Sequence, residues 1–257
     1  MSKNNYERNN TMVACIVAVL IIGAVGTGLM VWLGGTSWGS FSGPNWTATT
    51  DYSFEETESS MLDSVTLNLN LSAGGVNIEF IDDSNLLYHL DLTVPNETVS
   101  EHGEPSVVYS SGVVSFDYAA AEANLTLGSG TVYAMSISVD AGGVELVIGE
   151  NAHVGDVDIT AQAGGIDLTV TDDATFDGDV EFTLQASTGG VTLSVDLPST
   201  VGGSFAGTAS FGGVDVTTST WTEISSGHYE TSNYDSASQT LTITASAELG
   251  GIQATLS

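Results

Sequence analysis

The sequence predicts an all-β domain, built as a parallel β-solenoid, that follows one N-terminal transmembrane helix. Three observations lead to this prediction. A unit of strand, Gly-Gly and strand recurs along most of the chain, apolar residues alternate on both sides of each glycine pair, and an uncharged apolar run lies near the N-terminus. Alternation with a period of two is typical of strands that bury one face. An antiparallel β-sandwich is the alternative arrangement.

The apolar run comprises residues 12–33, and its 22 residues can cross a hydrocarbon core of about 30 Å as a helix. Lys3 and Arg8 are the only basic residues of the chain, and both precede the run. Positive charge is retained on the cytoplasmic side, so we expect a cytoplasmic tail at 1–11 and an extracellular remainder. A cleavable signal peptide is the alternative, but its apolar stretch is usually only about 7 to 15 residues long. The prediction is a single-pass protein of the cell membrane.

The chain carries a formal net charge of −30, and no basic residue follows Arg8. Binding to nucleic acid depends on Lys and Arg, so the composition excludes nucleic acid as a partner. Cations, neutral glycans and cell-surface proteins remain as expected partners. Because like charges repel more in a compact state, we expect a habitat rich in salt or acid. Cysteine is absent from the exterior part, so its stability must come from a packed core.

Residues 34–59 are rich in Gly, Ser, Thr and acidic residues and are expected to form a flexible stalk. The repeat domain is predicted at 60–257. Its six copies are VTLNLNLSAGGVNIEF, AMSISVDAGGVELVIG, DVDITAQAGGIDLTV, EFTLQASTGGVTLSV, SFAGTASFGGVDVTT and LTITASAELGGIQATLS. The glycine pairs are Gly74 and Gly75, Gly142 and Gly143, Gly164 and Gly165, Gly189 and Gly190, Gly212 and Gly213, and Gly250 and Gly251.

The alternation of inward and outward residues shifts by one residue across each glycine pair. Ala163 and Ile166, for example, are three residues apart, yet both are expected to face the core. A bend is required there, and glycine suits it because it reaches positive φ without strain. The middle pairs recur every 22 to 25 residues, which suits one coil of a solenoid. The 68-residue gap before Gly142 could hold two degenerate coils, with strands at 86–94 and 107–118. The 38-residue gap before Gly250 leaves an aromatic segment near 221–238, which is expected to cap the stack.

A membrane helix followed by strand pairs centred on Gly-Gly resembles the adhesin-like, or toast-rack, surface domains. The resemblance covers roughly residues 60–257. It implies a right-handed β-solenoid-like stack and offers no catalytic residues.

Two kinds of candidate binding site can be located in the sequence, for hard cations and for attached glycans. The loop 171–179 concentrates four carboxylates, and the first outward position after the glycine pair holds two more that would be adjacent if coils stack in register. Calcium is therefore considered at Asp172, Asp173, Asp177 and Asp179 and at Glu145 with Asp167, and no other cofactor is expected. Four sequons lie in the exterior part and would carry glycans, as on archaeal surface proteins: Asn45, Asn70, Asn96 and Asn124. The four histidines show no metal-ligand spacing and are expected to be ordinary surface residues.

Adjacent aspartates such as Asp82 and Asp83 could in principle act as acid and base, as in β-helical enzymes that cleave acidic polysaccharides. Such enzymes use basic side chains to hold the substrate, and this chain has none in its exterior part. We therefore expect a non-enzymatic surface protein with a role in adhesion or envelope structure. The alternatives are a sensory ectodomain of an envelope-stress system and a polysaccharide-active enzyme.

Overall fold

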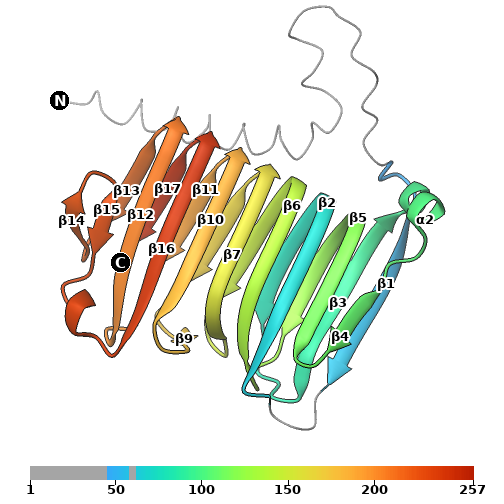
Figure 1. Ribbon diagram of the computed structural model, residues 1–257, viewed down its shortest axis with the longest axis horizontal. Helices are drawn as coiled ribbons and strands as arrows, with labels where there is room; N and C mark the ends of the chain where they lie inside the picture. Colours follow the sequence, from blue (N-terminus) through green and yellow to red (C-terminus); the bar gives the residue numbers. More distant parts are fainter. Residues whose placement is uncertain (1–44, 58–61) are drawn as a thin grey trace, which may run out of the picture. The chain divides into compact units, whose positions relative to one another are not determined.

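A computed structural model describes residues 45–57 and 62–257, and residues 46–257 form one compact unit (Figure 1). The elements are β1 (Thr49–Thr57), β2 (Ser64–Phe80), β3 (Leu86–Pro95), α2 (Asn96–His102), β4 (Val107–Ser110), β5 (Val113–Leu127), β6 (Val132–Ile148), β7 (His153–Ala163), β8 (Ile166–Val170), β9 (Thr175–Phe176), β10 (Val180–Thr188), β11 (Val191–Val195), β12 (Val201–Phe211), β13 (Val214–Thr218), β14 (Thr222–Ser225), β15 (His228–Glu230), η2 (Tyr234–Ser236), β16 (Gln239–Leu249) and β17 (Ile252–Leu256).

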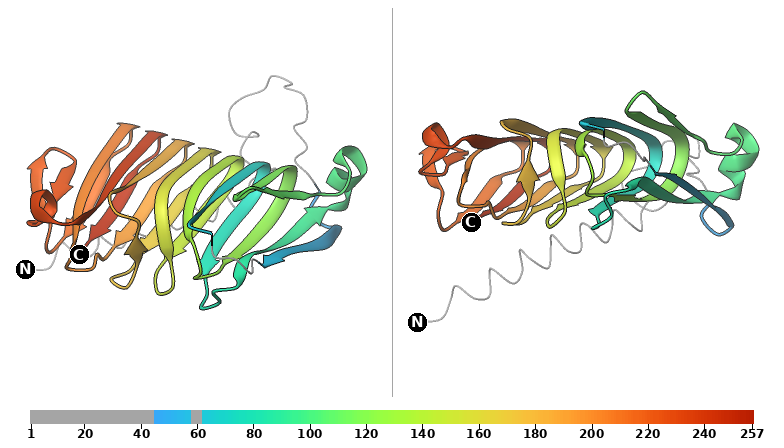
Figure 2. Two further views of the ribbon diagram at one scale, coloured as in Figure 1. Left: turned by 60° about the horizontal axis from the view of Figure 1, so that its bottom comes forward. Right: turned by 90° about the horizontal axis from the view of Figure 1, so that it is seen from below.

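Each repeat unit crosses the molecule twice, and the units stack into two parallel ladders joined at the glycine corners (Figure 2). The ladder before the corner runs β5, β2, β6, β7, β10, β16, β12. The ladder after the corner runs β5, β2, β6, β8, β11, β17, β13. The pairing within the repeats is parallel and in register, so the antiparallel sandwich is wrong for them. The handedness of the coil stays a prediction.

The stacking order departs from chain order at both ends of the unit. The β5 strand lies outside β2, although it follows β2 in sequence. At the other end the last unit, β16 and β17, lies between β10 with β11 and β12 with β13. The chain therefore places its outermost unit first and then returns to fill the position that it skipped. This return path accounts for the long gap before Gly250.

Antiparallel strands cover both ladders at the β5 end and part of the β12 ladder at the other end. At one end β3 pairs with the second half of β5, β4 pairs with the first half, and β1 adds to β3. At the other end β15 pairs with residues 204–206 of β12, and β14 pairs with β15. Trp221 is 5% exposed, so the predicted cap role of the aromatic segment is confirmed for that residue.

The gap before Gly142 holds one degenerate unit rather than two. Residues 86–94 do form a strand, but it is antiparallel. Residues 107–118 are divided by a reversal at Ser111 and Gly112, which both have positive φ and join β4 to β5 as a hairpin. The true unit is β5, where Ala121 and Glu122 pair with Gly74 and Gly75.

The core lies between the two ladders and consists of their inward Val, Leu, Ile and Phe side chains. Burial alternates along the strands as predicted, with Leu67, Ile159 and Leu193 no more than 1% exposed. Before the corner, the last buried residue lies two residues earlier in the chain than expected. Ala141 and Ala163 are exposed, whereas Val139 and Ala161 are buried. The shift in the alternation is confirmed, since Ala161 and Ile166 are both buried and lie an odd number of residues apart.

The folded unit begins before the expected boundary at residue 60. Tyr52 and Phe54 of β1 pack against the core, so residues 49–57 belong to the sheet rather than to a stalk. The composition concealed this strand because its other residues are polar. The predicted cytoplasmic tail, transmembrane helix 12–33 and first part of the stalk lie outside the described residues. In the described part of the chain, no helix is sufficiently long and apolar to cross a membrane.

Candidate functional site

A row of polar side chains follows the corner along the outer face of the second ladder. Each unit contributes its first outward residue, and the strand register places these residues side by side, about 4.8 Å apart. In stacking order this outward row is Asp91, Asn124, Asn77, Glu145, Asp167, Thr192, Gln253 and Asp215. The row carries a carboxylate on β3, β6, β8 and β13 and a neutral polar side chain on the four strands between them.

The predicted adjacency of Glu145 and Asp167 is confirmed, because the two residues are direct partners on β6 and β8. Partial loss of solvent raises the pKa of the Asp167 carboxyl, and the neighbouring Glu145 charge raises it further. Beside them a cavity of about 360 Å³ is lined by Asn77, Glu79 and Glu150, among others. This part of the row presents closely spaced oxygen acceptors on a rigid sheet.

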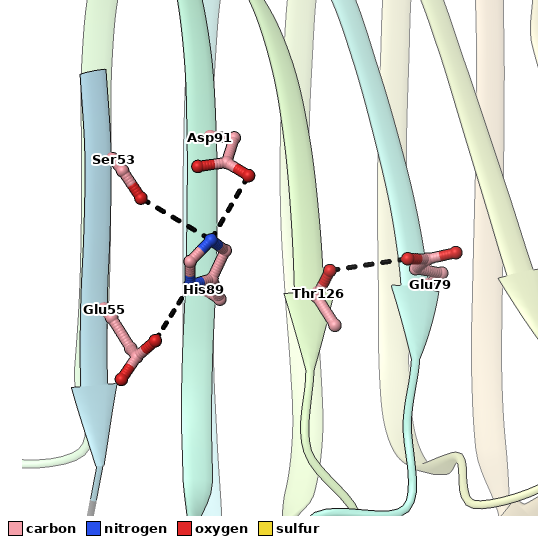
Figure 3. A network of polar contacts seen from close by, with 6 residues as sticks. All are labelled: Ser53, Glu55, Glu79, His89, Asp91 and Thr126. Atoms are coloured by element: carbon pink, nitrogen blue, oxygen red, sulfur yellow. Dashed lines mark hydrogen bonds and ion pairs between the residues drawn. The ribbon is translucent and has the colours of Figure 1, made fainter. Parts of the chain in front are cut away.

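A second polar cluster surrounds His89 at the β1 edge of the same face (Figure 3). His89 Nδ1 lies 2.9 Å from Glu55 Oε2, and His89 Nε2 lies 3.2 Å from Asp91 Oδ2. Ser53 Oγ is 3.5 Å from Nε2. One strand further on, Thr126 donates to Glu79 Oε1 at 3.4 Å. Because both ring nitrogens face carboxylates, the arrangement suits the doubly protonated imidazolium.

The electrostatics of His89 follow from these contacts. The hydrogen bond to Glu55 raises the pKa of the imidazole, Asp91 raises it further, and partial burial opposes both. No Lys or Arg occurs in residues 45–257, so histidine is the side chain that can supply positive charge there near neutral pH. His89 was expected to be an ordinary surface residue. Its spacing from Asp91 on one strand was a usable signal, but Glu55 lay in the presumed stalk.

The structure divides the predicted calcium ligands between two places. Glu145 and Asp167 lie near the corner, whereas Asp172, Asp173, Asp177 and Asp179 lie in exposed turns beyond the other end of β8. In those turns Asp173 accepts a hydrogen bond from Thr171, and Asp179 accepts one from Thr240 at 2.9 Å. Across residues 45–57 and 62–257, no three acidic, histidine or cysteine side chains form a group that could hold a metal ion. Calcium binding stays a prediction.

The four predicted glycosylation acceptors, Asn45, Asn70, Asn96 and Asn124, are all exposed. Asn70 donates to Asp117 at 3.3 Å, and Asn96 accepts from Thr50 at 2.7 Å. Modification at these positions stays a prediction.

Comparison with known proteins gives a fold likeness. No family model matches the sequence, and no curated protein matches it significantly. A crystal structure of a candidate cell adhesion protein from Clostridium sporogenes aligns with a TM-score of 0.67 at 15% identity, over 82% of this chain and 100% of that one.

Candidate adhesins from Bacteroides fragilis and Parabacteroides distasonis align over 80% and 81% of this chain and 97% of theirs. Their TM-scores are 0.27 and 0.26, at 9% and 10% identity. The alignment with the Clostridium sporogenes structure confirms the resemblance to the adhesin-like toast-rack domains at the level of the fold.

Proposed function

We propose that this chain is a non-enzymatic, membrane-anchored protein of the cell surface whose folded unit serves adhesion or envelope structure. The observation that carries the proposal is the outward row, in which the register holds one polar side chain per unit on a rigid sheet. Such a row offers many weak, evenly spaced contacts, which suits multivalent attachment to glycans or to proteins. The fold likeness to a candidate adhesion protein and the apolar run at 12–33 support it.

The test displays the full chain on cells and measures their attachment to a glycan-coated or protein-coated surface. Replacing Asn77, Glu145 and Asp167 by alanine removes the centre of the outward row and should abolish attachment. The control replaces Asn68, Ser136 and Asp158, an equivalent exposed row on the outer face of the other ladder. It should leave attachment intact.

Two results would contradict the proposal. One is equal attachment by both variants and the parent chain. An external domain behind a cytoplasmic tail requires that protease added to intact cells releases the folded unit and leaves an N-terminal tag intact. The second contradicting result is any other pattern of cleavage.

A further inference from the structure

The two ladders are covered equally at one end of the stack and unequally at the other. At the β5 end, β4 pairs with the half of β5 that belongs to the first ladder, and β3 pairs with the half that belongs to the second. At the other end, β15 and β14 extend the β12 ladder by two strands, whereas β13 pairs with no described strand other than β17. The inner face of the hairpin formed by β14 and β15 therefore has no described strand opposite it.

This difference leaves a slot between β13 and the hairpin. Val214 and Val216 of β13 are only half-buried. Their equivalents in β5, Ala123 and Leu125, are each 2% exposed, because β3 lies beside them. The two valines and Tyr229 of the hairpin line a cavity of about 290 Å³. What this end lacks is a strand in the position that β3 holds at the other end.

The open edge of β13 presents the backbone groups that such a strand needs. Ile252 donates to the carbonyl of Gly213, and Ser219 donates to the carbonyl of Leu256. Odd-numbered residues of β13 therefore bond to β17, and the even-numbered ones point their N–H and C=O groups toward the open side. An edge of this kind is a template for another extended segment.

Charge indicates which kind of segment fits the slot. Phe205 of β12 is buried, Tyr229 is its partner on β15, and Glu223 is the partner of Tyr229 on β14. Because opposed residues share a face of the sheet, Glu223 continues this inward row with a carboxylate, and it lines the same cavity. Asp215 adds a second carboxylate on the outer face of β13. Residues 45–257 contain no Lys or Arg, so a second copy of this unit offers these carboxylates no counter-charge, whereas a basic segment does.

We propose that the open edge of β13 binds an extended, basic segment of another protein. The segment adds antiparallel to β13, as β3 does to β5, and exchanges hydrogen bonds with the even-numbered residues. Its inward side chains cover Val214 and Val216, and a Lys or Arg among them reaches Glu223 across the slot. A second basic side chain on the outer face lies opposite Asp215. The hairpin leaves room for a single strand there, because it extends the opposite ladder, about 10 Å away.

The first experiment titrates the full chain, in detergent at about 0.1 M sodium chloride, with the capped synthetic peptide Thr-Val-Thr-Lys-Lys-Val-Thr. Aligned antiparallel to β13, this peptide places one lysine opposite Val216 and the other opposite Asp215. Calorimetry should detect binding, and the same peptide with glutamine in place of both lysines should bind at least about tenfold more weakly.

A matched pair of variants separates the slot from general attraction to an acidic surface. Glu223→Gln should weaken binding of the lysine peptide by about three- to tenfold and leave binding of the glutamine peptide unchanged. The control is Glu181→Gln, which removes an exposed carboxylate from the outer face of β10. It should have little effect. Equal weakening by the two variants would overturn the proposal.

The second experiment tests strand addition by hydrogen exchange. The lysine peptide should protect the amides of residues 214, 216 and 218, while those of 215 and 217, which already bond to β17, should change little. Val216→Pro removes one open N–H group, which an edge strand tolerates, and should weaken binding by at least about threefold. A melting curve checks that this variant folds.

Two further results would overturn the proposal. One is peptide binding without protection of the even-numbered amides. The other is absence of peptide binding to the parent chain. If Glu223→Gln then associates with itself, the inward carboxylate serves instead to keep the edge unpaired.

Discussion

At the residue scale, the first glycine of each pair is required because its neighbour occupies the space of a side chain. Gly142 has φ of +149°, and a Cβ placed on it would overlap the carbonyl oxygen of Gly74 in the next unit. The contact repeats along the stack, so each corner holds the next one close. In the outermost unit, Ala121 stands where the other units have this glycine. No further unit is stacked on its outer side, so its methyl group has room.

The second glycine of a pair is less constrained, which gives a matched prediction. Gly142→Ala should lower the free energy of unfolding by at least about 2 kcal/mol, from overlap and from the unfavourable φ. Gly143→Ala should change it by less than about 1 kcal/mol, because the nearest atom to its Cβ is the Gly165 carbonyl oxygen at 3.4 Å. Denaturant unfolding of the two variants measures the difference. Equal losses would refute the role assigned to the first glycine.

At the element scale, β1 is attached to the unit through β3 at the edge of the sheet. Its contribution to the core is limited to the partly buried Tyr52 and Phe54. The Glu55, His89 and Asp91 cluster is the charged contact that joins β1 to β3 on the outer face. The protonation state of His89 should therefore affect how firmly β1 is held.

His89 should stabilise the fold mainly in acid. Its pKa is raised in the folded state, so its contribution is complete below the unfolded pKa of about 6.5 and disappears as pH rises through the folded pKa. His89→Gln should reduce stability at pH 5.5 by up to about 1 kcal/mol and have little effect at pH 9. Hydrogen exchange of β1 amides should show the same trend.

The control for this prediction is His102→Gln, since that ring lies 3.9 Å from its nearest carboxylate, Glu101. Because this longer contact is the weaker one, His102→Gln should reduce stability at pH 5.5 by less than His89→Gln does. A loss at His89 that is constant from pH 5.5 to pH 9 would mean that packing, rather than charge, explains the contact.

The sequence predicted the local structure better than the order of the units. Alternation and glycine pairs are local signals, so strands and corners were correctly located for units such as the one around Gly164. The order of the outer units depends on edges and caps formed by distant segments, which leave no periodic signal. The β5 unit was missed as a corner because Ala121 and Glu122 replace the glycines, and β1 was missed because only two of its residues pack inward.

In the candidate site, too, the sequence predicted what the repeats encode and missed what depends on a distant segment. Glu145 and Asp167 were predicted to be adjacent from the repeat alignment, and the register confirms it. The His89 cluster depends on a partner from β1, which no repeat signal could supply.

At the scale of the whole molecule, negative charge without counter-charge dominates the electrostatics. Residues 45–257 contain no Lys or Arg, and the net charge of the chain is −30. Burial and the Glu145 charge raise the pKa of Asp167, and burial raises that of Glu122. A raised folded-state pKa means that the folded state retains protons that the unfolded state has lost. The folded state is destabilised as a result. This loss of stability is absent in acid, grows as pH rises between the unfolded and folded pKa values, and persists above them.

Melting temperature at neutral pH should therefore rise with sodium chloride, since the Debye length falls from about 10 Å at 0.1 M to about 3 Å at 1 M. Asp167→Asn should also raise it at pH 7 and leave it nearly unchanged at pH 3. The control Asp158→Asn should raise it less, because its in-register neighbours Ser136 and Thr183 are uncharged. Differential scanning calorimetry at both pH values checks these expectations.

Calcium discriminates between general screening and a specific site in the same assay. Millimolar calcium should reproduce the gain of molar salt only if carboxylates bind it directly. Loss of that gain in Asp172→Asn with Asp173→Asn would assign the site to the turn after β8. Loss in Glu145→Gln with Asp167→Asn would assign it to the outward row. A gain that survives both pairs of changes would contradict both predicted calcium sites, and melting that is indifferent to salt and pH would contradict the electrostatic account as a whole.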